Sequence, residues 1–183
     1  MEISYKNKHA DLIDRCIEGE TLTERLSCAP YPRAQLARVR REIAMGRDAL
    51  HTEKVVFREL APSRVIIAQK DGRAILTDFE LAKLLDTAPT VSADWPDDPY
   101  RAPEVEDGVA SERSDLYSWA RILLRAASGE ELPTKGQDSD ALTQVGLPKA
   151  VWRVGTDCLS PAPSDRPKSV QVVLKAIETW TGT

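Results

Sequence analysis

Three charged side chains between residues 59 and 78 are of types that take part in chemistry. The carboxylate of Glu59 can accept a proton, and the carboxylate of Asp78 can ligate a metal cation. The guanidinium of Arg64 cannot ligate a cation, because it offers only donors and its fixed positive charge repels one. Two interpretations of Arg64 stay open: it replaces a metal by pairing with Asp78, Glu59 or both, or it lies at a water-exposed surface.

Other metal ligands are few and scattered. The chain has two histidines, His9 and His51, and three cysteines, Cys16, Cys28 and Cys158, which are far apart and lack CxxC spacing. We therefore expect no zinc or other metal site. An odd number of dispersed cysteines predicts reduced thiols and a cytoplasmic protein.

The segments that would position these groups are mostly helical. Apolar periodicity predicts helices at residues 21–27, 33–50, 114–127, 148–159 and 167–180. Thr21 and Glu24 have capping-box spacing. The helix at 114–127 is apolar on most faces, which predicts a buried central helix that stops near Gly129.

Extended and irregular segments are short or polar. Two apolar runs, 65–67 and 74–76, flank Asp71-Gly72 and predict a small β-hairpin, and residues 12–17 predict a short strand. Residues 84–112 are rich in Pro, Asp, Ser and Thr and predict a long, mostly irregular loop. The predicted fold class is therefore mainly α (α+β).

Composition excludes several function classes. The chain has 183 residues, of which 42% are apolar and 30% charged, enough for one soluble domain with a core. A net charge of −4 argues against nucleic-acid and membrane-surface partners. The sequence has no run of about 18 apolar residues, so it predicts no membrane-spanning helix. Its first residues lack the apolar core of a signal peptide.

Five ordered motifs carry a family resemblance. ALHTEKVVFRELAPSRVII (49–67) is similar to a kinase catalytic loop, LTDFELAK (76–83) to the D-F-G segment, and YRAPE (100–104) to the A-P-E motif. SDLYSW (114–119) and CLSPAPSDRP (158–167) resemble the family's buried central helix and its late arginine segment. The chain thus resembles the eukaryotic-type Ser/Thr protein kinases.

The resemblance implies a partial kinase domain. It assigns residues 12–183 to a kinase-like C-terminal lobe and residues 1–11 to an N-terminal extension. IEGETLTERL (17–26) resembles the hinge and the first helix of that lobe. The sequence contains no Gly-rich loop and no lysine strand upstream, so we expect the N-terminal lobe to be absent.

The resemblance also implies degenerate catalytic positions. Glu59 stands at the catalytic aspartate, Arg64 at the metal-binding asparagine, and Asp78 at the metal-binding aspartate, while Glu80 replaces a glycine. The longer glutamate moves the carboxylate, and a displacement of about 1 Å can cost roughly 10²-fold. Phe57, at the motif histidine, is expected to pack with Phe79.

Other positions match structural and regulatory roles of the family. Glu104 and Arg166 match a buried ion pair, and Asp115 matches the residue that holds the catalytic-loop backbone. Arg58 could bind a phosphate on the following loop or form an ordinary ion pair. Possible phosphorylation sites in that loop are Thr87, Thr90 and Ser92.

These features predict a non-catalytic pseudokinase module, not an enzyme, with neither ATP nor magnesium bound. It would act through a protein partner, a neighbouring domain or a second copy, at the face that a missing N-terminal lobe exposes, which includes Ile17 and Ile66. The alternative is a weak or complemented Ser/Thr kinase that needs a separate N-terminal lobe. A purely regulatory loop, phosphorylated by another kinase, is a third possibility.

Overall fold

A computed structural model describes residues 2–6, 9–13, 17–28, 31–78, 83–84, 97–178 and 180. The helices are α1 (Leu22–Cys28), α2 (Arg33–Thr52), α3 (Pro103–Glu106), α4 (Glu112–Ser128), α5 (Asp138–Gln144), α6 (Lys149–Cys158) and α7 (Val170–Ile177). The strands are β1 (Glu2–Lys6), β2 (His9–Ile13), β3 (Gly19–Thr21), β4 (Val55–Val56), β5 (Val65–Ala68), β6 (Ala74–Leu76) and β7 (Lys83–Leu84). Short 3₁₀ turns occupy Pro62–Arg64 and Pro163–Asp165. The described fold is mostly helical, as predicted.

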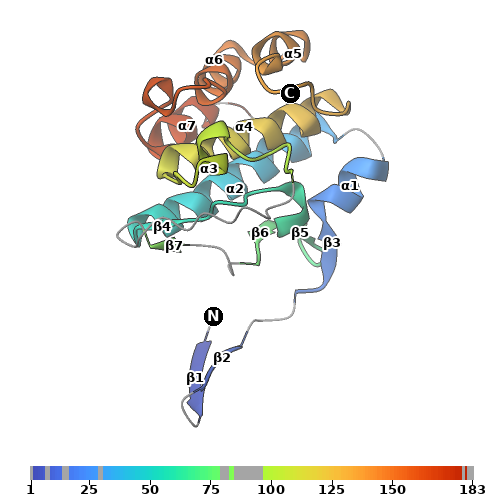
Figure 1. Cartoon of the computed structure of the whole chain (residues 1–183). Helices are drawn as coiled ribbons and strands as arrows, with labels where there is room; N and C mark the ends of the chain where they lie inside the picture. Colours follow the sequence, from blue (N-terminus) through green and yellow to red (C-terminus); the bar gives the residue numbers. More distant parts are fainter. Residues whose placement is uncertain are drawn as a thin grey trace.

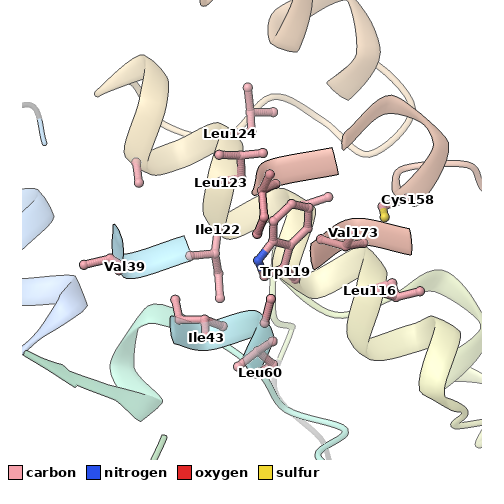
Figure 2. Packing of buried hydrophobic residues seen from close by; sticks show 14 of the residues in the cluster. Val39, Ile43, Leu60, Leu116, Trp119, Ile122, Leu123, Leu124, Cys158 and Val173 are labelled. Carbon is pink, nitrogen blue, oxygen red and sulfur yellow. The ribbon is translucent and has the colours of Figure 1, made fainter. Parts of the chain in front are cut away.

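Helices α2 and α4 form the centre of the molecule. Figure 1 shows α5, α6 and α7 on one side of this pair and the strands β3 to β7 on the other. Trp119 of α4 is 1% exposed and packs among Ile43, Ile122 and Leu123 (Figure 2). Its indole nitrogen donates to the carbonyl of Arg40 in α2 at 3.0 Å. The shared apolar surface between these two helices drives their association.

Three antiparallel strands in the order β3-β5-β6 lie against α2. Ile66 pairs with Thr21 on one side and with Ile75 on the other, so β5 is the middle strand. The predicted hairpin at 65–67 and 74–76 is confirmed. Gly19 is required here because a Cβ atom at this position would lie 2.3 Å from the Ile67 carbonyl oxygen. The pairs β1–β2 and β4–β7 are also antiparallel.

Local signals fix several helix ends. The Thr21 amide donates to the Glu24 carboxylate at 2.7 Å, and the Glu24 amide donates back to the Thr21 hydroxyl at 3.2 Å, so the predicted capping box begins α1. Helix α4 ends at Ser128, and the capping residue Gly129 has a φ of 73°, which glycine readily adopts. It begins earlier than predicted, because Ser111 and Ser114 form a second capping box.

One predicted strand has other bounds in the structure, and two helices were not predicted. The predicted strand at 12–17 is wrong in its bounds: β2 ends at Ile13, and residues 14–16 lie outside the described part. The predicted helices do not include α5, whose Asp138 is buried against Arg121 of α4. The segment predicted to be a mostly irregular loop, 84–112, contains the short helix α3, which begins at a proline, a residue suited to the first helical position, and residues 85–96 of it lie outside the described part. None of the described helices has the length and apolar character needed to cross a membrane.

A buried ion pair joins α3 to the segment before α7. The Arg166 guanidinium donates to both carboxylate oxygens of Glu104, at 2.6 and 2.9 Å. It also donates to the carbonyls of Arg113, Ser160 and Pro161, and its side chain is fully buried. One side chain therefore satisfies carbonyls from α4 and from the turn that follows α6.

Replacing Arg166 tests the contribution of this ion pair to stability. Arg166→Met should lower the free energy of unfolding by about 3–5 kcal/mol, because the Glu104 carboxylate would be left largely buried without its partner. Urea denaturation gives the measurement. Arg153→Met, at an exposed position of α6, is the control and should change stability by less than about 0.5 kcal/mol. Equal losses in the two variants would contradict the assignment.

Candidate active site

The segment at 57–59 is held from the central helix by Asp115. Its carboxylate accepts the amide of Phe57 at 3.0 Å and the amide of Arg58 at 2.9 Å. His51, at the end of α2, lies 3.1 Å from the same carboxylate through its Nε2. Asp115 is 1% exposed, so these bonds form away from water and fix the backbone that precedes Glu59.

This backbone has an unusual conformation. Arg58 has a φ of 72°, in the left-handed region that costs a residue with a Cβ atom about 1–2 kcal/mol. The two bonds to Asp115 hold it there. Burial lowers the pKa of the Arg58 guanidinium, against the opposing charges of Glu59 and Asp115. Phe57 is 1% exposed and belongs to the hydrophobic core, whereas Phe79 and Glu80 lie outside the described residues.

The carboxylate of Glu59 is bound at both oxygens by arginines. Oε2 lies 2.5 Å from Nη2 of Arg64, and Oε1 lies 3.3 Å from Nη2 of Arg101. The side chains of Glu59 and Arg101 are 12% and 5% exposed, and that of Arg64 is 24% exposed. Because two of the three groups are largely buried, these ion pairs are weakly screened by solvent.

Arg64 and Asp78 meet through the backbone. Nη1 of Arg64 donates to the Asp78 carbonyl oxygen at 3.3 Å, and the Thr77 amide donates to the Arg64 carbonyl at 3.0 Å. The Asp78 carboxylate is instead near the Thr77 hydroxyl, at 3.5 Å, and the residue is exposed. Of the alternatives open for Arg64, the structure has it paired with the carboxylate of Glu59 and not with that of Asp78.

Arg101 was not singled out from the sequence. It follows Tyr100 directly before the A-P-E motif, and its contact with Glu59 spans 42 positions of the chain. The residues next to Arg101 do not indicate which carboxylate it pairs with, because that carboxylate lies 42 positions away and meets Arg101 only in the folded chain. Burial raises the pKa of the neighbouring Tyr100 to about 12.

Arginine side chains surround the carboxylate of Glu59. Within the described ranges no group of three histidine, cysteine, aspartate or glutamate residues could hold a metal ion. The guanidinium groups of Arg64 and Arg101 pair with Glu59, and that of Arg58 interacts electrostatically with both Glu59 and Asp115. The hydroxyl residues considered for phosphorylation, Thr87, Thr90 and Ser92, lie outside the described part of the chain.

Comparison with known proteins assigns the family. The protein kinase domain family matches residues 1–179. The chain belongs to the protein kinase domain family. The match spans the segment around Glu59, the ion pair of Glu104 with Arg166, and Asp115, so the geometry described above is that of a kinase-family chain.

Curated relatives include bacterial and animal protein kinases. Serine/threonine-protein kinase pkn2 of Myxococcus xanthus is 33% identical over 146 residues, covering 74% of this chain and 17% of that protein. Mitogen-activated protein kinase kinase kinase 13 of Mus musculus is 31% identical over 140 residues, covering 75% and 13%. Serine/threonine-protein kinase PkaB of Streptomyces coelicolor is 29% identical over 146 residues, covering 68% and 34%. The chain spans between about an eighth and a third of these relatives.

A double-mutant cycle on Glu59 and Arg101 tests the coupling in this site. The variants Glu59→Gln, Arg101→Met and their combination should give a coupling energy of about 1–3 kcal/mol in urea denaturation, because both side chains are largely buried. Asp71→Asn with Arg73→Met serves as the matched control, since that pair is 40% and 61% exposed. Its coupling should stay below about 1 kcal/mol. A coupling in the first cycle no larger than in the second would contradict the buried pairing.

Proposed function

We propose that the chain is a non-catalytic, kinase-like C-terminal lobe that acts as a protein-interaction or regulatory module. Two observations support this proposal: the chain belongs to the protein kinase domain family, and residues at its catalytic positions differ from those of the family's motifs. The single observation that carries the proposal is the binding of both carboxylate oxygens of Glu59 by Arg64 and Arg101.

A bound carboxylate is a poor candidate for a general base. To take a proton from a substrate hydroxyl, an oxygen of Glu59 must come within about 2.6–3.2 Å of that hydroxyl. Each oxygen already contacts a guanidinium, so a substrate hydroxyl would have to reach a remaining lone pair of a carboxylate held in a largely buried ion-pair network. These ion pairs compete with the positioning on which phosphoryl transfer depends.

The positive charge of Arg64 also disfavours catalysis. In kinases a catalytic-loop asparagine and the aspartate of the D-F-G segment hold the magnesium ions. Here the asparagine position is Arg64, whose guanidinium repels a divalent cation and offers it no lone pair. The residue is tied to Glu59 at 2.5 Å and to the Asp78 carbonyl at 3.3 Å, so it stays close to the space a metal would need.

One observation favours the alternative, a weak or complemented Ser/Thr kinase. The Asp78 carboxylate is exposed and is not paired with Arg64, so it remains able to ligate a cation. A kinase of this kind would need an ATP-binding lobe from another segment or another chain. Its activity would depend on Asp78, which separates it from the non-catalytic module.

Thermal unfolding with ATP and Mg²⁺ distinguishes the two proposals. We expect no metal-dependent rise in the midpoint at millimolar ATP and Mg²⁺, because a ligand stabilises a protein only if it binds the folded state. Asp78→Asn should behave as the wild type under the same conditions. A rise that requires Mg²⁺ and disappears in Asp78→Asn would favour the kinase alternative instead.

A further inference from the structure

Two strands near the start of the chain, β1 and β2, form a hairpin of their own. They pair antiparallel over their whole length, with Glu2 opposite Ile13 and Lys6 opposite His9. Figure 1 shows them apart from the helices, whereas β3, β5 and β6 lie against α2. A two-stranded hairpin is at best marginally stable in water, and further strands or a packed helix are needed to stabilise it.

Both outer edges of this hairpin are open within the described ranges. The sheet consists of β1 and β2, and no other described strand pairs with either of them. The backbone amides and carbonyls along such an edge are a template for an additional strand. The question is therefore which strand the sequence of the hairpin fits.

The two faces of the hairpin differ in polarity. Successive residues of a strand lie on opposite faces, and directly opposed residues share a face. One face therefore carries four apolar residues, which are Ile3, Tyr5, Ala10 and Leu12. The other face carries Glu2, Ser4, Lys6, His9, Asp11 and Ile13. An added strand must match this pattern, because a shift of one residue would exchange the two faces.

The sequence of β1 is complementary to itself in the antiparallel direction. When Ser4 lies opposite Ser4 of a second copy, Glu2 lies opposite Lys6 at both ends of the strand. In the same register Ile3 lies opposite Tyr5, so the apolar face is also matched. Opposed pairs of opposite charge, and of aromatic with β-branched residues, stabilise a sheet.

Other pairings of the hairpin are less favourable. Sliding one β1 strand by two residues keeps the faces in phase but separates Glu2 from Lys6 and leaves fewer residues opposed. Pairing β2 with itself about Asp11 would set two aspartates opposite one another, which is destabilising. Pairing β1 of one copy with β2 of the next would leave free edges and extend into a filament instead of closing a dimer.

We propose that β1 pairs antiparallel with β1 of a second copy about a two-fold axis at Ser4, forming one four-stranded sheet. The strand order is β2-β1-β1-β2, and the apolar faces of both hairpins lie on the same side. This contact deepens the proposed function, on which it rests for its role, by naming a second copy of the chain as the protein partner. It includes no residue of the Glu59 site, so it forms whether or not the chain is catalytic.

Sedimentation velocity of the full chain over a range of concentrations tests the charge pairing. Lys6→Glu sets two glutamates opposite one another at both ends of the strand, and should raise the Kd of the dimer at least about fivefold. Glu2→Lys should have the same effect with two lysines. The double variant Glu2→Lys/Lys6→Glu restores opposite charges and should return the Kd to within about twofold of the wild-type value.

Two further measurements control for net charge. Lys149→Glu makes the same charge change as Lys6→Glu at an exposed position of α6, and should alter the Kd less than about twofold. A mixture of the Lys6→Glu and Glu2→Lys chains should form a heterodimer more tightly than either variant forms a homodimer. Far-UV circular dichroism and thermal unfolding establish that each variant is folded.

A disulfide tests the position of the two-fold axis. Directly opposed residues of an antiparallel pair have Cα atoms about 4.5–5.5 Å apart, within the range that a disulfide spans. Ser4→Cys should therefore form a covalent dimer with oxidised glutathione, seen on a non-reducing gel. The wild type, which keeps its own cysteines, and Lys149→Cys should form several-fold less under the same conditions.

Three results would overturn the proposal. They are a chain that sediments as a monomer at every concentration, a Kd that Lys6→Glu leaves unchanged, and crosslinking of Ser4→Cys no greater than that of Lys149→Cys. None of them would alter the outcome of thermal unfolding with ATP and Mg²⁺. Failure of the dimer is therefore distinguishable from failure of the non-catalytic assignment, which depends on Asp78.

Discussion

The contact between Asp115 and the backbone at 57 and 58 is the constraint on which the candidate site depends. A buried carboxylate at the start of α4 accepts two amides and faces His51 of α2, so three separate segments meet at one side chain. The bonds stabilise a left-handed Arg58, and that conformation sets the direction in which the chain enters Glu59. The Asp115 carboxylate is 1% exposed, and burying it without hydrogen bonds would lower the stability of the fold. The amides of residues 57 and 58 supply these bonds.

Ion pairs are the second feature that orders the site. Both Arg64 and Arg101 pair with the carboxylate of Glu59, and this arrangement brings together the catalytic-loop segment and the chain before α3. The Glu104–Arg166 pair next fixes α3 against α4 and the turn before α7. The A-P-E segment is therefore held at two successive points by ion pairs of low exposure. In the proposed non-catalytic role, the arginines that order this region would also repel a divalent cation.

Local sequence signals predicted the elements whose ends depend on neighbours in the chain. The Thr21 capping box, the hairpin around Asp71-Gly72 and the stop at Gly129 involve interactions within a few residues. Helix α5 escaped prediction because its segment is polar and its stability comes from Asp138 buried against Arg121, 17 positions earlier. Helix α3 escaped because four residues are too few to show apolar periodicity.

For the site, the sequence by itself determined the residue types: a glutamate, an arginine and an aspartate at three positions of kinase motifs, and hence which side chains could accept a proton or repel a metal. Only the tertiary structure decided the pairings. Arg64 could have met Asp78 or Glu59, and Arg101 gave no sign of a role. The choice follows from the path of the chain, because an ion pair depends on distances of a few ångströms between residues that lie 5 to 42 positions apart.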